Sequence, residues 1–349
     1  MDLYIINRNF ETVGIIDNAA SVIWTEKYIG AGDFEIYIPA SGKAVDLLRD
    51  NYYIARSDTD RVMIIKNTKI RTDTENGNYL TVTGPSLESI LSRRIIWQQT
   101  NLYGKAELAV RRLIIENIIN PSTPERKIAN FKLGAVQGFD DVLEMQVTGD
   151  NLGETIDRIC KTYNMGYKIT LRDGHFVFDM YRGADRSYNQ SINPYVVFSP
   201  DFENLLNSDY SFTGDTYKNV VLVAGEGEGL ERKTKAVGDA SGLDRYEMYA
   251  DARNNSTNNG EISDTEYFAN LAEDGKETLK ENQAAESFSG EVNYTEPYLY
   301  GRDYFLGDVV QVVNEYGIAA TPTITETIEA DDENGYSLIP TFEYAGGVE

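Results

Sequence analysis

The first hundred residues alternate short apolar runs with polar turns. Apolar and aromatic residues recur at every second position in several runs, which is typical of strands with one buried face. Polar, glycine-containing segments such as 75–78 separate the runs. The pattern predicts strands at 3–7, 13–16, 21–28, 34–38, 53–56, 62–71 and 79–83. Several short strands at this spacing favour a β-barrel or a β-sandwich.

A helical period replaces this alternation after about residue 100. Ala106, Val110, Leu113 and Ile118 recur on one face at helical spacing, and Pro121 follows where that helix ends. The change of period indicates that a different kind of domain begins here.

A second helix followed by a hairpin completes this middle region. Asn151 begins the helix with a capping box, and Gly166 supplies its C-terminal stop. Two strands follow, joined at Asp173 and Gly174, because Asp-Gly between alternating apolar residues is a strong hairpin signal. The region 101–195 is therefore predicted to be a small α+β domain.

Strands return in the last part of the chain, 196–349. They are predicted at 205–213, 219–223, 246–250, 309–314, 318–329 and 336–343. Between them, Ser263 and Glu266 form a capping box that begins a helix over about 264–288. Together the three regions predict a mainly β chain with an α+β insertion.

Length and charge limit the functions that the chain can have. Its 349 residues are enough for two or three domains with ordinary hydrophobic cores. With 32 basic and 56 acidic residues, the formal charge is −24. A negative potential of this size repels polyphosphate and anionic lipid headgroups, so neither direct binding of nucleic acid nor stable membrane binding is expected.

The sequence also carries little that predicts export or disulfides. Its start lacks the basic and apolar regions of a signal peptide, and it has no run of about 18 apolar residues. The single cysteine, Cys160, lies on the apolar face of a predicted helix, where a buried and inert thiol is expected. We expect the protein to stay in the cytoplasm until something else releases it.

No set of residues predicts a catalytic, cofactor or metal site. His175 is the only histidine and follows a hairpin turn, which removes multi-histidine metal sites. The glycine-rich segment 225–229 lacks the spacing of a dinucleotide loop. The acidic turns 58–60 and 331–335 could each hold calcium, but neither has the EF-hand ligand series, so solvated turns are the better interpretation.

One enzymatic alternative stays open at the level of sequence. Glycoside cleavage needs only two carboxylates at a suitable distance, and the chain has 56 acidic residues. Aromatic rings that could stack on sugars gather at Tyr294, Tyr298, Tyr300 and Tyr304. A cell-wall carbohydrate-binding module or glycosidase is therefore an alternative, although tyrosine is equally favoured in strands and at protein interfaces.

Two segments carry a resemblance to a known family. The segments 21–39 and 300–310 resemble the signature segments of the tail-hub, or tail-associated, proteins of siphovirus-like phages and prophages, which are related to the hubs of contractile baseplates. The residues that carry the likeness are Trp24, Tyr28, Gly32, Phe34, Tyr37, Pro39, Asp303, Tyr304, Leu306, Gly307 and Asp308. We interpret them as core and turn residues that identify a scaffold and do not mark an active site.

The resemblance implies an architecture and a set of partners. It implies two β-barrel-like domains, over 1–100 and 196–349, and a homotrimeric ring that joins the tail tube to the tail tip. The implied partners are a tail tube or distal tail protein, the tape-measure protein and a separate spike or tip protein, with DNA only as passing cargo. The chain ends soon after its last predicted strands, so lytic or receptor-binding functions are expected in other chains.

The same resemblance gives the charge a second interpretation. An acidic lining of a central channel would let DNA pass without sticking. The implied location is the virion, reached after assembly in the host cytoplasm, and no enzymatic activity is expected. A hexameric distal tail or adaptor protein stays open as a further alternative.

Overall fold

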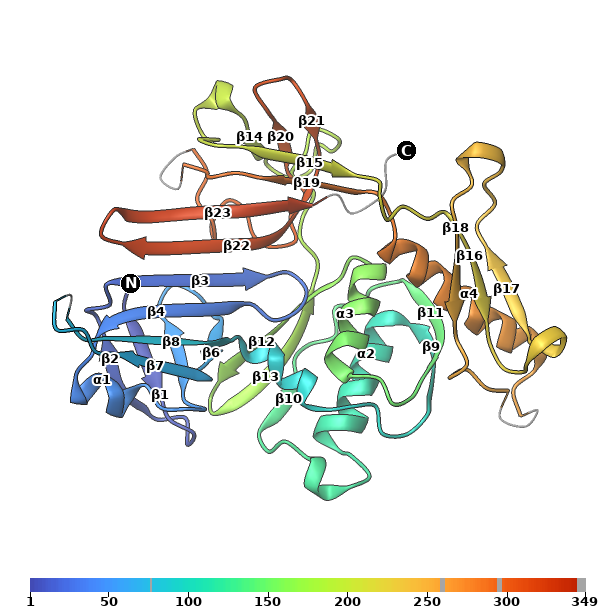
Figure 1. Ribbon diagram of the computed structural model, residues 1–349, viewed down its shortest axis with the longest axis horizontal. Helices are drawn as coiled ribbons and strands as arrows, with labels where there is room; N and C mark the ends of the chain where they lie inside the picture. The colour runs from blue at the N-terminus through green and yellow to red at the C-terminus, as the bar shows by residue number, and fades with distance from the viewer. Residues whose placement is uncertain (76, 258–260, 294–296, 344–349) are drawn as a thin grey trace.

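One antiparallel sheet of eight strands runs through the molecule and joins the two ends of the chain (Figure 1). The computed structural model describes residues 1–75, 77–257, 261–293 and 297–343. The strand order is β15 (Asp209–Thr213), β19 (Ala285–Ser289), β23 (Gly335–Glu343), β22 (Thr323–Asp332), β3 (Ser21–Lys27), β4 (Asp33–Pro39), β8 (Tyr79–Pro85) and β7 (Asn67–Arg71). The N-terminal and C-terminal strands meet where β22 pairs with β3, with Glu329 opposite Trp24.

A second sheet packs against the N-terminal half of this sheet. Its strands, in order, are β2 (Thr12–Ile16), β1 (Leu3–Ile6), β5 (Tyr53–Arg56) and β6 (Val62–Ile64), and the short helix α1 (Gly42–Leu47) lies beside them. Phe34, Ile36 and Ile38 of β4 point into the core between the two sheets, while the residues that alternate with them are exposed. The period of two thus builds a sandwich.

The strand predicted over 62–71 is two strands in different sheets. All three residues of β6 are buried, whereas all five residues of β7 are exposed at the edge of the eight-stranded sheet. The prediction of one continuous strand was wrong, because the chain crosses from one layer of the sandwich to the other at Ile65 and Lys66.

The middle region packs around one core, which also includes Val62 and Ile64 of β6. It contains η1 (Leu87–Arg93), β9 (Thr100–Lys105), α2 (Ala106–Ile114), η2 (Ile115–Ile119), η3 (Pro124–Arg126), β10 (Phe131–Leu133), β11 (Val142–Val147), α3 (Leu152–Thr162), β12 (Gly166–Arg172) and β13 (His175–Tyr181). The Asn151 side chain accepts hydrogen bonds from the amides of Gly153 and Glu154, which caps α3 as the sequence predicted. The hairpin turns at Asp173 and Gly174, both with positive φ.

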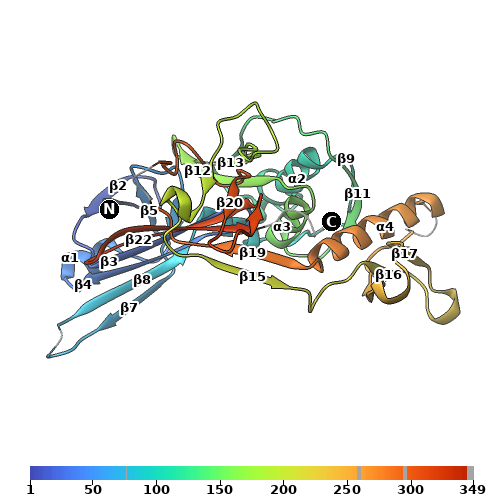
Figure 2. The ribbon, with the colours of Figure 1, turned by 90° about the horizontal axis from the view of Figure 1, so that it is seen from above.

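A small unit is inserted between β15 and β19. It contains β16 (Val220–Ala224), η5 (Gly229–Glu231), β17 (Thr234–Val237), η6 (Gly242–Asp244), β18 (Glu247–Asp251) and α4 (Asp264–Glu281). Figure 2 shows β16, β17 and α4 at one end of the molecule, where α4 packs on this three-stranded sheet and on β11.

The helix in this unit ends earlier than predicted. Ser263 caps it as expected, but it stops at Glu281, and β19 follows within the stretch predicted as helical. Phe288 of β19 lies opposite Phe342 of β23 and is buried in the C-terminal core. Pairing with β15 and β23 buries this aromatic side chain, and that overrides the local helical propensity.

The C-terminal half of the large sheet packs on a third, smaller layer. That layer contains β14 (Val197–Phe198), η4 (Pro200–Phe202), β20 (Gln311–Val313) and β21 (Ala319–Ala320). The prediction of a mainly β chain is confirmed. Among the described strands no sheet closes into a barrel, because β22 pairs with β3 and thereby merges the two predicted β units into one open sheet.

Candidate functional site

The two segments that carry the family resemblance meet at the junction of the three regions. Tyr28, just after β3, packs closely against Gly307: a Cβ on Gly307 would lie 2.3 Å from Tyr28 Cε2. A Cβ on Gly166 of β12 would lie 2.0 Å from the same atom. The Tyr28 hydroxyl donates to the carbonyl of Asn164 at 3.1 Å. One tyrosine therefore touches the N-terminal, middle and C-terminal parts of the chain.

Asp308 closes the turn on the C-terminal side of this junction. Its carboxylate accepts hydrogen bonds from the amide of Phe305 at 3.0 Å, the amide of Ala184 at 2.6 Å and Nε of Arg186 at 2.6 Å. Asp308 is 2% exposed, so these donors replace the water that a carboxylate needs. The predicted turn 306–308 is thus a connector between the C-terminal region and the segment after β13.

Trp24 and Glu26 lie on the N-terminal side of the junction. Trp24 is fully buried, and its Nε1 donates to Glu26 Oε1 at 3.1 Å. The Glu26 carboxylate also accepts from the hydroxyls of Thr59 at 2.6 Å and Tyr300 at 3.3 Å. Burial raises the pKa of Glu26, although Arg61 and the hydrogen bonds from Thr59 and Trp24 oppose the shift. Three donors from separate segments make this carboxylate a structural acceptor.

Two buried arginines extend the network across the junction. Arg56 of β5 pairs with Glu329 of β22 at 2.8 Å and with Asp58 at 2.6 Å. Its guanidinium also lies 5.3 Å from the centre of the Trp24 ring. Tyr336 donates its hydroxyl to the same Glu329 at 2.5 Å.

Arg61 makes the second set of contacts. It pairs with Glu88 of η1 at 2.5 Å and donates to the Tyr181 hydroxyl at 3.0 Å and to the Lys27 carbonyl at 3.2 Å. Glu88 in turn accepts from the amide of Ile169 at 2.9 Å. Arg61 and Glu88 are 6% and 1% exposed, so the pair is a buried salt bridge between the N-terminal and middle regions.

The remaining residues of the resemblance divide between this junction and the sheet. Tyr304 and Leu306 are buried in the C-terminal core, and Asp303 accepts from the Leu299 amide at 2.8 Å. Tyr37 stacks on Tyr79 with ring centres 4.4 Å apart. A Cβ on Gly32 would lie 2.0 Å from the Thr25 carbonyl oxygen, Phe34 is buried near Trp24, and Pro39 is the exposed last residue of β4.

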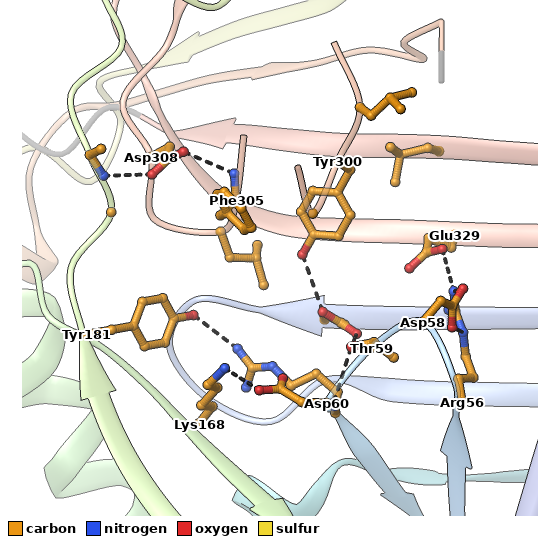
Figure 3. A pocket seen from close by; sticks show the side chains of 18 of the residues that line it. Arg56, Asp58, Thr59, Asp60, Lys168, Tyr181, Tyr300, Phe305, Asp308 and Glu329 are labelled. Atoms are coloured by element: carbon orange, nitrogen blue, oxygen red, sulfur yellow. Dashed lines mark hydrogen bonds and ion pairs between the residues drawn. The ribbon is translucent and has the colours of Figure 1, made fainter. Parts of the chain in front are cut away.

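The junction contains a cleft of about 780 Å³. Figure 3 shows polar and charged groups that point toward one another across it, with Arg56, Asp58 and Glu329 on the right, Tyr181 on the left, and Lys168 and Asp60 below. The charged side chains that line it have partners in ion pairs or hydrogen bonds. The sequence analysis did not predict the roles of Arg56, Arg61 and Glu88. The one signal that the sequence offers for them is that each is a charged residue within or next to an otherwise apolar segment.

The carboxylates of the two acidic turns considered as calcium sites form ion pairs within the chain. Asp58 and Asp60 of the first acidic turn pair with Arg56 and Lys168. Asp331 of the second pairs with the N-terminal amine at 2.5 Å. In the described ranges, with their gaps at 76, 258–260, 294–296 and 344–349, no group of three or more His, Cys, Asp or Glu side chains could hold a metal ion.

His175, Cys160 and the glycine-rich segment also have structural surroundings. His175 Nδ1 lies 2.8 Å from the Asp173 carbonyl at the hairpin turn, and Cys160 is buried as predicted. A Cβ on Gly225 would lie 2.0 Å from the Tyr267 hydroxyl. The glycine therefore allows α4 to approach β16, which explains it without a phosphate.

The tyrosines of the carbohydrate alternative do not form a platform in the described part of the chain. Tyr304 is fully buried, and Tyr298 and Tyr300 pack partly buried against the same core. Tyr294 lies outside the described residues. None of the described helices is long and apolar enough to cross a membrane.

The fold defines the class of protein. The tail protein from Neisseria meningitidis MC58 is 15% identical, with a TM-score of 0.60 over 98% of this chain and 95% of that chain. The 43 kDa tail protein of prophage MuSo2 from Shewanella oneidensis is 11% identical, with a TM-score of 0.62 over 99% of both chains. The prophage tail protein gp18 from Listeria monocytogenes EGD-e is 10% identical, with a TM-score of 0.53 over 98% and 94%. This chain thus has the fold of phage and prophage tail proteins.

The sequence identifies the family. The chain belongs to the family described as Siphovirus ReqiPepy6 Gp37-like protein, whose model matches residues 2–342. No curated protein matches the sequence. The predicted resemblance to phage and prophage tail proteins is confirmed.

Proposed function

We propose that this chain is the structural baseplate hub of a phage tail or a phage-tail-like particle. Three copies form a ring that joins the tail tube, or a distal tail protein, to the tail tip or a separate spike. The tape-measure protein and DNA pass through the ring, and the chain has no catalytic role. It enters the virion after assembly in the host cytoplasm.

The observation that carries this proposal is an eight-stranded sheet with two free edges. Among the described strands, β7 pairs only with β8, and β15 pairs only with β19. Unpaired N–H and C=O groups at such edges readily accept another strand. The edges lie at opposite ends of one sheet, so β7 of one copy and β15 of the next can form the repeated heterologous contact that closes a ring.

The open face of this sheet supports a channel. The face opposite the cores carries mostly small polar and charged side chains from alternate positions of each strand. Its described carboxylates are Asp33, Glu35, Asp209, Glu326, Asp332 and Glu343, and its cations are Lys27, Lys69 and Arg71. The excess of carboxylates, with hydroxyl side chains between them, suits a surface past which DNA slides.

The buried carboxylates at the junction of the three regions all have partners, which supports a structural role. Carboxylates that serve as a general acid or a nucleophile need access to substrate, whereas Glu26, Glu88, Glu329 and Asp308 are each at most 6% exposed. Their partners come from segments far apart in the chain. The network fixes the relative placement of the three regions, as a ring component requires.

Light scattering of the purified protein over a range of concentrations tests the proposal. A mass of three chains, with a central hole in electron micrographs, is the expected result. A mass of six chains would instead indicate a distal tail ring. A monomer that stays single both in solution and when mixed with its tail tube protein would overturn the hub proposal.

A further inference from the structure

Four arginines that make no ion pair with a described carboxylate gather on one surface, with Asp50 near Arg93. Five of the chain's arginines make no ion pair with a described carboxylate, and four of these five lie close together: Arg8, Arg93, Arg94 and Arg126. Arg94 Nε donates to the carbonyl of Arg126 at 3.0 Å. Glu125, next to Arg126, forms no ion pair with them. In a chain with a formal charge of −24, an unneutralised cluster of this kind is unexpected.

An exposed tryptophan lies in the same place. Trp97 is 59% exposed, and the Arg126 guanidinium lies 5.1 Å from the centre of its ring. Ile95 beside it is 42% exposed. Two hollows of about 290 and 350 Å³ flank the ring, and both are lined by Trp97 and Arg126. Trp and Arg next to pockets are the residue types that contribute most at protein interfaces.

We call this surface the arginine patch and define it by Arg93, Arg94, Trp97 and Arg126. In Figure 1 the strands of the large sheet follow one another downward from β15 to β7, and the segment that follows α2 and contains η3 lies lower still. At the other end, β15 lies in the upper part of the picture, below β14, β20 and β21. A copy that pairs its β15 with β7 would therefore bring the surface around its β15 toward the arginine patch.

The surface around β15 has the complementary chemistry. We call it the β15 margin and define it by the exposed residues Asp201, Phe202, Glu203, Glu315 and Tyr316. None of its three carboxylates makes an ion pair with a described cation. Ser208 donates to Glu315 at 2.9 Å, which fixes that carboxylate at the start of β15. Phe202 and Tyr316 are 56% and 83% exposed.

We propose that the arginine patch of one copy binds the β15 margin of the next copy. This contact rests on the proposed ring and names a second interface for it, beside the edge pairing of the sheet. It matches unpaired arginines with unpaired carboxylates, and it covers Trp97 with the apolar side chains of the margin. Nucleic acid is the other ligand that arginines bind. A second copy of the chain is favoured over it, because the second copy also pairs with β7 at the edge of the sheet.

Quenching of tryptophan fluorescence reads this contact directly in the unmodified protein. The chain has two tryptophans, and Trp24 is fully buried, so acrylamide reaches only Trp97. Formation of the trimer should lower the quenching constant of the accessible fluorescence several-fold. A trimer whose Trp97 is quenched as readily as in the monomer would overturn the proposed contact and leave the hub proposal intact.

A charge swap tests the partner. Arg94→Glu with Arg126→Glu should raise the trimer dissociation constant by about tenfold or more, because each side would then be acidic. Adding Glu203→Lys and Glu315→Lys should recover most of the affinity at the original net charge. Lys105→Glu with Lys132→Glu is the control, since it changes net charge equally on exposed residues elsewhere.

The outcomes separate the two proposals. Equal affinity of the patch variant and the control, with a trimeric parent, would reject the contact alone. A parent protein that is monomeric under all conditions would reject the ring and the contact together. Binding of a single-stranded oligonucleotide by the patch in place of the β15 margin would also reject the contact.

Discussion

Tyr28 illustrates how single residues hold the three regions together. Its ring lies against the backbones of Gly166 and Gly307, and its hydroxyl bonds to the backbone of the turn after α3. Gly307 also has a φ of +90°, a conformation that other residues rarely adopt. Two requirements, backbone conformation and close approach, therefore meet at one glycine.

Gly307→Ala should destabilise the protein by about 2–4 kcal/mol, through backbone strain and a clash with Tyr28. Gly301→Ala is a matched control: its φ is +80°, but nothing lies within 4 Å of the added Cβ. Urea unfolding followed by circular dichroism measures both. Equal losses in the two variants would show that the contact with Tyr28 does not matter.

The buried pair of Arg61 and Glu88 permits a second test at this scale. Arg61→Met should cost about 3–5 kcal/mol, because Glu88 would stay buried without its cation. The double variant Arg61→Met, Glu88→Met should recover much of this loss. Arg49→Met, in an exposed pair with Asp46, should leave the urea midpoint nearly unchanged. If the double variant is no more stable than Arg61→Met, the pair does not act as a unit.

At the scale of elements, α4 packs on α3 through carboxylates. Glu277 is 3% exposed, and its Oε2 lies 3.0 Å from Nε of Arg158. Burial raises the pKa of Glu277 to about 8, with Asp274 and Glu273 adding to the shift and Arg158 opposing it. Burial also raises the pKa of Asp274 to about 6. The folded chain therefore holds protons that the unfolded chain releases near pH 4.5.

Stability should consequently fall as the pH rises from about 4.5 to about 8, and level off above that range. Glu277→Gln should remove the upper part of this dependence and stabilise the protein at pH 8 by a few kcal/mol. Urea unfolding at pH 5, 6.5 and 8.5 measures the slope. Asp264→Asn, at the exposed start of the same helix, serves as the control. A slope that Glu277→Gln leaves unchanged would contradict this assignment.

The edge strand β7 allows a test of ring closure. Successive N–H groups of a strand point to opposite sides, so one of Thr68→Pro and Lys69→Pro keeps the bonds to β8 and removes an outward donor. That variant should stay folded by circular dichroism and should form trimers at least about tenfold less readily. Normal trimer formation by both variants would exclude β7 as a pairing edge.

At the scale of the whole molecule, the proposed channel follows from the open face of the sheet. Asp33 and Glu35 alternate with buried residues of β4 and are exposed on that face. Asp33→Lys with Glu35→Lys should leave trimer formation intact and slow DNA release several-fold, because cations would bind the passing phosphates. Release from assembled particles is the measurement. Asp140→Lys with Asp239→Lys is the control, and equal release in the two would contradict an acidic channel.

The predictability of the site differs between its two halves. Trp24, Phe34, Tyr304 and Gly307 were singled out through the resemblance to a family, and their residue types fit core and turn positions. Their charged partners were not. Arg56 and Glu329 are far apart in the chain and resemble surface residues until the sheet places them together.

The sequence by itself determined the elements, because hydrophobic period, capping residues and turn residues act over a few positions. It predicted the mainly β class, the caps of α3 and α4 and the hairpin at Asp173. Only the tertiary structure decided that β22 pairs with β3, that α4 ends before β19 and that one open sheet spans both ends of the chain. These features depend on backbone pairing and burial between distant segments, which no local pattern records.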